Sequence, residues 1–208
     1  MDITKRDILL VATSVLLSLL GSTYMYKIHT KETPREQEQN LIRDYYNTEN
    51  LVSVSPHGMR LKMDAGEFDA VLVDLRSAEE YEAGHITGAI NIPAYKDKNT
   101  PDYGAVERIV ESFQLIPKDK EIITYCYSTA CMTSRKIGKM LVDHNIYVKH
   151  LNIGWNEWRN DWQSFNHQHE WYSTWAYQYI TTGKEAGEIK VRKENVENAT
   201  CPANGFGC

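Results

Sequence analysis

Short apolar runs alternate with amphipathic stretches between residues 51 and 165, and this alternation constrains the fold more than any other feature. A short apolar run bounded by turn residues indicates a buried strand, whereas apolar residues spaced three and four apart indicate one face of a helix. Alternating strands and helices predict an α/β domain with a mainly parallel sheet. The predicted strands are Val71–Asp74, Ala89–Pro93, Glu121–Tyr125 and Tyr147–Leu151, and the predicted helices are Tyr103–Gln114, Met132–His144 and one opened by Gly154 that contains Trp155, Trp158 and Trp162.

A stretch without charge precedes this domain. It runs from Ile8 to Tyr26, and as a helix it would be about 28 Å long, close to the thickness of the hydrocarbon core of a bilayer. We therefore expect residues 1–27 to form an N-terminal signal anchor, a single transmembrane helix that contacts membrane lipid through residues 8–26. A cleaved secretory signal is the alternative, because the most apolar part, Ile8–Leu20, is short enough for one. A short N-terminal tail usually stays in the cytoplasm, so the globular domain is expected in a periplasm.

Two polar or mixed segments flank the predicted domain, which covers residues 51–165. Residues 28–50 are expected to be a tether with one short helix at Gln37–Tyr46. Residues 166–208 form a C-terminal extension, and its part from Thr181 onward is expected to be mostly irregular. The aromatic segment Trp171–Ile180 either packs on the domain, which we favour, or lies on a membrane or a partner protein.

Composition and cysteine spacing exclude several classes of protein. The net charge is −5 and no basic stripe is visible, so we expect no nucleic-acid partner. No Cys-x-x-Cys spacing occurs, and His167 with His169 is too little for a metal site, so we expect neither a metal nor a cofactor. Cys201 and Cys208 enclose a glycine-containing loop and are a candidate disulfide outside the cytoplasm.

Cys126 is the strongest candidate for chemistry. It follows the predicted strand Glu121–Tyr125 directly and precedes a predicted helix. Unpaired N–H groups at a helix N-terminus favour a negative charge, which lowers the pKa of a thiol placed there. The resulting thiolate is a nucleophile that can accept sulfur and become a persulfide. The alternative is a buried cysteine with only a structural role.

Four motifs, in order along the chain, resemble the rhodanese family. They are Val73–Arg76 with Glu79–Tyr81, Gly84–Pro93, Tyr125–Ser128 and Leu151–Trp158. The resemblance implies an α/β domain with a rhodanese-like parallel sheet flanked by helices. It also implies a sulfurtransferase in which Cys126 holds sulfane sulfur taken from a donor such as thiosulfate or a persulfide. The anchor, the tether and the tail are left unexplained.

The resemblance also assigns roles around Cys126. Asp74, Arg76 and His85 would be supporting residues that tie the motifs together. A loop would surround the sulfur with its amides, and its residues are Tyr127, Ser128, Thr129, Ala130, Cys131 and Met132. This loop departs from the family pattern because it contains no cation and no glycine, and Arg135 and Lys136 lie too far along the helix to be counted on. The loop therefore offers little help to the thiosulfate dianion. Met132 occupies the arginine position of related phosphatases, so phosphatase activity is not expected.

Cys131 leaves more than one function open. It can attack a persulfide or sulfenate on Cys126 and form a disulfide, or it can be a small side chain that points into the domain. We favour an enzyme, a membrane-anchored rhodanese-like sulfurtransferase or persulfide carrier. The alternatives are a non-catalytic rhodanese-fold subunit that docks in a membrane protein complex, and a thiol-disulfide redox protein that uses Cys126 and Cys131.

Overall fold

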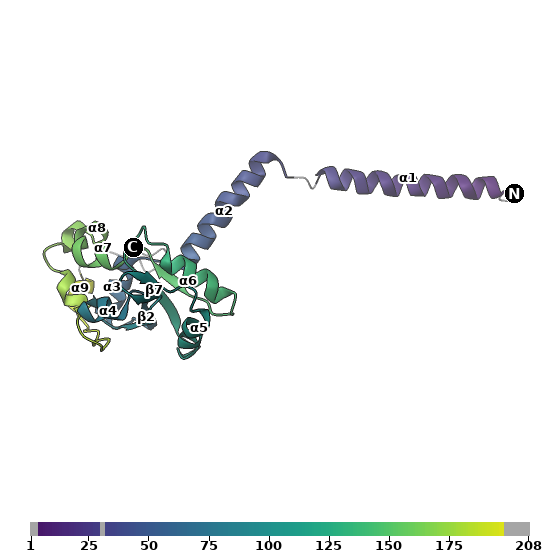
Figure 1. The fold of residues 1–208 in the computed structure, drawn as a ribbon. Helices are drawn as coiled ribbons and strands as arrows, with labels where there is room; N and C mark the ends of the chain where they lie inside the picture. The colour runs from purple at the N-terminus through teal and green to yellow at the C-terminus, as the bar shows by residue number, and fades with distance from the viewer. Residues whose placement is uncertain (1–3, 30–31, 198–208) are drawn as a thin grey trace. The chain divides into compact units, whose positions relative to one another are not determined.

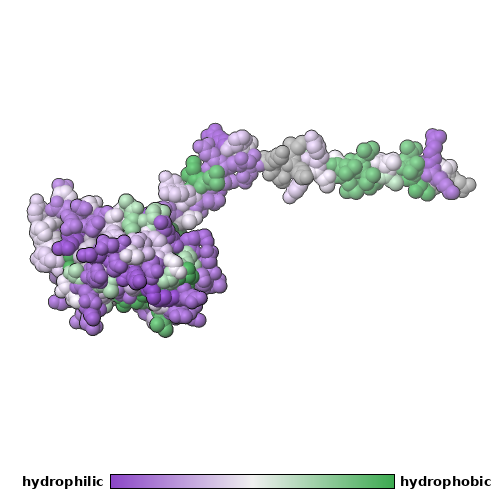
Figure 2. Space-filling view, viewed as in Figure 1, coloured by the Kyte–Doolittle hydropathy of each residue, from purple (hydrophilic) through white to green (hydrophobic). Residues whose placement is uncertain are grey.

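The computed structural model describes residues 4–29 and 32–197, and the chain divides into two units, residues 1–48 and 49–208 (Figure 1). The first unit contains α1 (Lys5–His29) and most of α2 (Pro34–Val52). Between Lys5 and Tyr26, α1 is long and apolar enough to cross a membrane, and its described side chains are exposed (Figure 2). Helix α2 occupies most of the expected tether and is longer than the short helix expected there.

The second unit is built on a sheet of five parallel strands, in the order β1-β8-β7-β2-β4. The prediction of an α/β fold with a parallel sheet is therefore confirmed. The sheet strands are β1 (Ser53–Val54), β2 (Ala70–Asp74), β4 (Ala89–Asn91), β7 (Glu121–Tyr125) and β8 (Lys149–Leu151). The two-residue strand β1 was not predicted, because two residues are too few to show a periodic pattern.

Side chains that alternate along the strands separate two apolar layers, since successive residues of a strand point to opposite faces. Leu72, Ile123 and Tyr125 pack in one layer, and Val73 and Ile122 pack in the other. The first layer is covered by α3 (Pro56–Ala65), α7 (Trp155–Asn160) and α8 (Trp162–Phe165), and the second by α5 (Val106–Gln114) and α6 (Thr133–Val142). The sheet is thus flanked by helices on both faces, as expected. The remaining elements are α4 (Ala78–Ala83), β3 (His85–Ile86), β5 (Tyr95–Asp97), β6 (Thr100–Pro101), β9 (Ile180–Thr181), α9 (Lys193–Glu197) and two 3₁₀ helices (Gln168–Glu170 and Ala176–Tyr179).

The predicted helix with three tryptophans is in fact two helices. Asp161 has φ −117° and ψ 40°, which is not helical, and it separates α7 from α8. The three predicted tryptophan side chains are nevertheless buried in one cluster, and Trp158 stands edge-on to Trp162 with their ring centroids 5.3 Å apart. The periodicity therefore identified the buried face correctly but not the break in the backbone.

The chain beyond Phe165 folds back onto the domain instead of leaving it. Strand β9 pairs antiparallel with β3, with Ile180 opposite Ile86, and Tyr179 is buried in the tryptophan layer. The folded unit thus continues past the boundary expected at Phe165, and β9 and α9 occupy part of the segment that was expected to be irregular. Cys201 and Cys208 lie outside the described residues, so their pairing remains a prediction.

Candidate functional site

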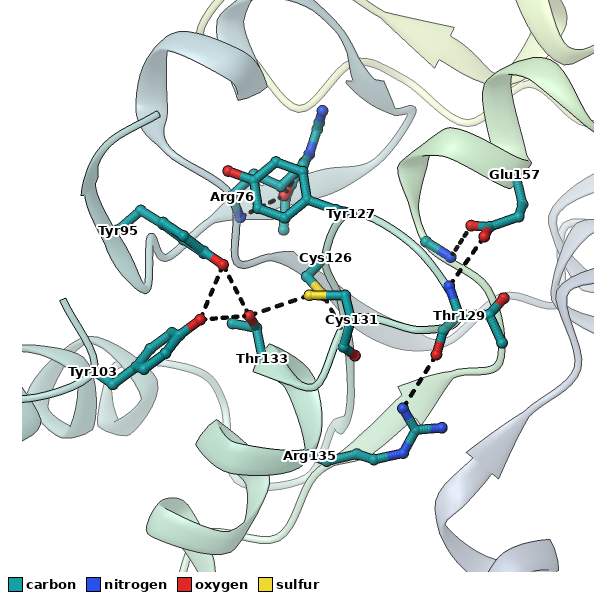
Figure 3. Close-up of a disulfide and its surroundings, with 12 residues drawn as sticks. Arg76, Tyr95, Tyr103, Cys126, Tyr127, Thr129, Cys131, Thr133, Arg135 and Glu157 are labelled. Carbon is teal, nitrogen blue, oxygen red and sulfur yellow. Dashed lines mark hydrogen bonds and ion pairs between the residues drawn. A yellow bond between two sulfur atoms is a disulfide. The ribbon is translucent and has the colours of Figure 1, made fainter. Parts of the chain in front are cut away.

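Cys126 follows β7 at the carboxyl end of the sheet (Figure 3). Its side chain is only 2% exposed and packs in the layer beneath α5 and α6. Two backbone amides at the start of α7 hold the chain here, because Trp155 N–H donates to Cys126 O at 2.8 Å and Asn156 N–H donates to Tyr127 O at 2.9 Å. The candidate nucleophile is therefore fixed by a strand on one side and by a helix start on the other.

Gly154 is required where α7 meets the loop. A Cβ at this position would lie 2.2 Å from Ser128 N and 2.4 Å from Tyr127 C, closer than any side chain can approach. The carboxylate of Glu157 accepts hydrogen bonds from Gly154 N–H at 3.0 Å and from Thr129 N–H at 3.1 Å. Glu157 thus joins α7 to the loop, a role that a capping-box pattern after Gly154 would have indicated.

The structure contains a disulfide between Cys126 and Cys131. Their Cα atoms are 6.7 Å apart. Cys131 is half-buried, whereas Cys126 is buried. Two loop amides expected to face the Cys126 sulfur donate elsewhere, Thr129 N–H to Glu157 and Cys131 N–H to Ser128 O at 2.9 Å. A disulfide sulfur carries no negative charge, so in this state Cys126 offers no anion to the loop amides.

Three hydroxyl groups form a cluster beside Cys131 that sequence reasoning missed. Thr133 Oγ1 lies 3.2 Å from Cys131 Sγ, 3.0 Å from Tyr95 OH and 2.9 Å from Tyr103 OH (Figure 3). The two phenol oxygens are 3.0 Å apart. Burial raises the pKa of Tyr95, so this phenol keeps its proton at neutral pH. No local sequence signal links the two tyrosines to the loop, because they precede Thr133 by at least 30 residues.

A carboxylate also lies beside the loop. Tyr127 OH donates to Glu80 Oε2 at 2.5 Å, and Ser77 OH donates to the same oxygen at 2.8 Å. Burial, together with the adjacent Glu80 carboxylate, raises the pKa of Tyr127 well above its ordinary value. Ser77 precedes α4 as a capping residue would, but its hydroxyl bonds the Glu80 side chain and not a backbone amide.

The three predicted supporting residues lie in the contacts that join the motifs. Asp74 accepts from Arg76 Nη2 at 2.6 Å and from Tyr125 OH at 2.7 Å, and Arg76 Nη2 also donates to Gly84 O at 2.7 Å. Burial lowers the pKa of Arg76, but the hydrogen bond and the charge of Asp74 outweigh it and raise that pKa overall. His85 Nδ1 contacts the backbone oxygen of Tyr81 at 2.8 Å. All three side chains are buried, so the structure places them as framework around the loop.

The cations expected to lie too far along the helix are close to the site. Arg135 Nη1 donates to Thr129 O at 3.4 Å, and Lys136 Nζ lies 5.3 Å from the ring centroid of Tyr103. Both side chains are exposed. Arg135 therefore reaches the outer rim of the loop, although its contact is with a carbonyl oxygen and not with the cysteine sulfur.

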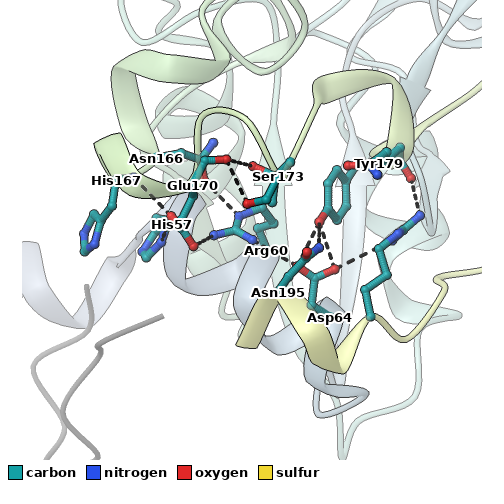
Figure 4. Close-up of polar contacts among 12 residues, drawn as sticks. His57, Arg60, Asp64, Asn166, His167, Glu170, Ser173, Tyr179 and Asn195 are labelled. Carbon is teal, nitrogen blue, oxygen red and sulfur yellow. Dashed lines mark hydrogen bonds and ion pairs between the residues drawn. The ribbon is translucent and has the colours of Figure 1, made fainter. Parts of the chain in front are cut away.

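A second cluster of ionisable residues joins α3 to the C-terminal segment (Figure 4). His57 Nε2 lies 2.8 Å from Glu170 Oε2, and Arg60 donates to Glu170 Oε1 at 2.5 Å and to Asp64 Oδ2 at 3.0 Å. Tyr179 OH donates to Asp64 at 2.8 Å. Burial lowers the pKa of His57, so this ring is neutral at neutral pH. The side chains of this network are buried, and its contacts hold the segment after Phe165 on the domain.

Part of this cluster has the composition of a metal site. His57, His167 and Glu170 offer ligand atoms within 4.8 Å of one another. Two observations count against a metal there. The Arg60 guanidinium already binds the Glu170 carboxylate, and a cation nearby would be repelled by it. The rings of His57 and His167 are stacked, with centroids 4.3 Å apart, so their lone pairs run side by side and do not converge. The contacts favour a structural role for this cluster.

Comparison with known proteins gives similarities over the same region. A family model described as a rhodanese-like domain matches residues 55–161, just over half of the chain. Among curated proteins, the HTH-type transcriptional regulator Rv0324 of Mycobacterium tuberculosis is 34% identical over 98 residues, which are 47% of this chain and 37% of that protein. The chain thus spans well under half the length of this relative.

Solved structures of similar chains include three bacterial proteins. BH2092 of Bacillus halodurans is 26% identical with a TM-score of 0.47, and covers 59% of this chain and 82% of its own. A rhodanese with anions from E. coli is 26% identical with a TM-score of 0.28, and the match covers 41% of this chain and 85% of that one. The rhodanese-like domain of Alr3790 from Anabaena sp. is 14% identical with a TM-score of 0.41, and the match covers 76% of this chain and 90% of that one.

The family match covers four of the five sheet strands, β2, β4, β7 and β8, together with Cys126, its loop and the start of α7 that contacts the loop. The chain belongs to the rhodanese-like domain family.

Proposed function

We propose that this protein is a membrane-anchored sulfurtransferase or persulfide carrier that holds sulfane sulfur on Cys126. The observation that carries the proposal is the position of Cys126, between the end of β7 and the start of α6 inside the matched rhodanese-like region. A thiolate at this place lies near the unpaired N–H groups of a helix N-terminus, which favour its negative charge.

The reaction starts from the reduced form of the site. The Cys126 thiolate attacks the sulfane sulfur of a donor, a Cys126 S–S bond forms, and the remainder of the donor leaves with the electron pair of its broken bond. A nucleophilic acceptor then takes the outer sulfur and releases the Cys126 thiolate. The loop amides that donate to Glu157 and Ser128 in the disulfide form become available to the anionic persulfide when the loop rearranges.

The charges around the loop favour a persulfide over thiosulfate as the donor. Glu80 lies against Tyr127, and Glu157 accepts from a loop amide, so two carboxylates adjoin the loop. Arg135 is exposed at the loop's outer rim, where solvent screens its charge. A donor with one negative charge therefore meets less repulsion than the thiosulfate dianion.

The apolar segment Lys5–Tyr26 supports the membrane part of the proposal. A retained signal anchor would hold the rhodanese-like domain near the bilayer through residues 8–26, with the domain in a periplasm. A donor or an acceptor in or near the membrane would then be within reach.

The Cys126–Cys131 disulfide favours a second candidate function, that of a thiol-disulfide redox protein. Such a protein would cycle between dithiol and disulfide without sulfane sulfur. A non-catalytic subunit that docks in a membrane protein complex is a third candidate, and part of a protein named as a transcriptional regulator is similar to this chain.

Sulfur transfer to cyanide distinguishes these functions. The full-length protein in mild detergent is reduced, freed of reductant and supplied with either cysteine persulfide, which has a net charge of about −1, or thiosulfate, and thiocyanate is measured against a blank without protein. The wild type and Cys131→Ser should both form thiocyanate above the protein-free blank, faster with the persulfide, and Cys126→Ser should form no more than the blank.

Equal thiocyanate formation by Cys126→Ser would overturn the assignment of Cys126. If the wild type forms no thiocyanate with either donor but its dithiol oxidises and is reduced reversibly, the redox function replaces the sulfurtransferase. If neither reaction occurs and Cys126→Ser supports the cellular role, the docking function stands.

A further inference from the structure

The two cysteines of the site differ in exposure. Cys126 Sγ is buried, since its side chain is 2% exposed, whereas Cys131 is half-buried at the far end of the loop. In the disulfide form Cys126 exposes less of its surface to solution than Cys131 does. Cys131 already lies within bonding contact of the Cys126 sulfur. The nearest acceptor for sulfur chemistry at Cys126 is therefore a side chain of the same loop.

The hydroxyl cluster is directed at the sulfur atom of Cys131. A disulfide sulfur has no hydrogen to donate, so the 3.2 Å contact with Thr133 Oγ1 has the hydroxyl as its donor. The Thr133 hydroxyl has a single hydrogen, so its oxygen is left as an acceptor toward the phenols, and Tyr95 OH and Tyr103 OH lie 3.0 Å and 2.9 Å from it. Thr133 is 2% exposed, so water hardly competes for these bonds. This chain of hydroxyls ends at Cys131 and supplies a proton donor to an anion formed there.

The backbone near Cys131 favours the same anion. Helix α6 begins at Thr133, two residues after Cys131, and the N–H groups of its first turn have no partner within the helix. A helix N-terminus stabilises negative charge. The helix start and the Thr133 hydroxyl thus both favour Cys131 as a thiolate in the reduced protein.

We propose that Cys131 is a resolving nucleophile that discharges a persulfide on Cys126 as sulfide, and that Thr133, with Tyr95 and Tyr103, positions and stabilises the Cys131 thiolate for this attack. This inference rests on the proposed function, because it needs a persulfide on Cys126. It adds an activity, the release of sulfide by the protein itself, and it makes the disulfide in the structure the product of that activity.

The step balances without an outside oxidant. The Cys131 thiolate attacks Sγ of the Cys126 persulfide, the Cys126–Cys131 S–S bond forms, and the bond between Sγ and the outer sulfur breaks. The outer sulfur leaves as hydrosulfide with the electron pair of that bond and the proton of the persulfide. The two cysteines are oxidised and the sulfane sulfur is reduced. Two molecules of an external thiol then reduce the disulfide and leave as an external disulfide.

The test is a single turnover on the full-length protein in mild detergent. The reduced protein, freed of reductant, is loaded with inorganic polysulfide and desalted, and released sulfide is measured together with intact mass. The wild type should release one sulfide per persulfide and lose two hydrogen atoms as the disulfide forms. Cys131→Ser should keep its extra sulfur atom until dithiothreitol is added.

Variants of Thr133 test the positioning role. Thr133→Val should slow sulfide release about tenfold at neutral pH, because a hydrogen bond to a charged group is worth roughly 1.5 kcal/mol or more. Its rate should recover at higher pH, where the Cys131 thiolate forms without help. Thr133→Ser keeps the hydroxyl and should restore the wild-type rate and pH profile, which a purely structural role of Thr133 would not predict.

The outcomes separate this inference from the function on which it rests. If Cys131→Ser loads and releases sulfide at the wild-type rate, Cys131 is not the resolving thiol although Cys126 still carries sulfur. If Thr133→Val has the wild-type pH profile, the hydroxyl chain has no role in the step. If no variant that retains Cys126 gains sulfur, the sulfurtransferase proposal itself fails.

Discussion

Replacing Glu170 with glutamine should weaken the attachment of the C-terminal segment to the domain. Glu170 lies between Arg60 and His57, and both Arg60 and Glu170 are almost completely buried, with exposures of 0% and 2%. Glu170→Gln keeps the shape and one acceptor oxygen but removes the charge. The Arg60 guanidinium then remains buried with only the Asp64 carboxylate, at 3.0 Å, to balance it.

The expected loss follows from these contacts. Removal of one partner of a buried ion pair costs roughly 3–5 kcal/mol, because the other charge is left without compensation. Two contacts reduce this figure here: Asp64 still pairs with Arg60, and the glutamine oxygen can still accept from Arg60 Nη2. We therefore expect Glu170→Gln to lower the free energy of unfolding by about 2–3 kcal/mol.

Urea unfolding of the full-length protein, followed by tryptophan fluorescence, measures this change, since the tryptophans lie between residues 155 and 175 and near the network. Glu111→Gln is the matched control, because Glu111 is exposed on α5 and its substitution should change the free energy by no more than about 0.5 kcal/mol. A Glu170→Gln protein as stable as the control would refute the view that this buried pair holds the segment.

Three further predictions concern the loop, the buried histidine and the anchor. Gly154→Ala should lower the free energy of unfolding by about 1–3 kcal/mol, because its Cβ would meet the backbone of the loop. Gly104→Ala is the control, because a Cβ there meets nothing within 4 Å, and it should change the stability in urea far less. Equal stabilities of the two variants would contradict the close approach of Gly154 to the loop backbone. The unfolded chain protonates His57 near its ordinary pKa of 6.5, whereas burial lowers the pKa of His57 in the folded chain, so the stability of the wild type should fall as the pH drops below 6.5. The stability of His57→Gln, measured by urea unfolding at several pH values, should fall less steeply. Parallel stability curves for the two proteins would contradict a lowered pKa of His57. Deletion of residues 5–26 should move the protein from the alkali-resistant membrane pellet of a bacterial host into the soluble fraction, and a full-length protein that alkali extracts would argue against a spanning helix.

Local patterns predicted the framework of the site. Short apolar runs identified β2 and β7, and the run before Cys126 placed this cysteine at a strand end. These features depend on neighbours within a few residues, which is the range over which periodicity carries information. Four ordered motifs then indicated the family before any contact was known.

Contacts between distant segments were beyond such patterns. Arg60 and Glu170 are 110 residues apart, and neither lies in a periodic run that links one to the other. The pairing of β3 with β9 joins two strands of two residues each, too short to show alternation. Tyr95 and Tyr103 reach Thr133 only because the sheet and α6 bring their segments together. The missed features are thus those that only tertiary packing creates.

The measurement that tests the central claim most directly is the mass of the intact protein after exposure to a sulfane donor, with the extra sulfur located by fragmentation. Because Cys131 would discharge the persulfide, the Cys131→Ser protein is used, reduced and freed of reductant. The account predicts a gain of one sulfur atom on Cys126 that dithiothreitol removes and that is absent when Cys126 is also replaced by serine. A Cys126 thiol that titrates normally but gains no sulfur from polysulfide or from thiosulfate would contradict it.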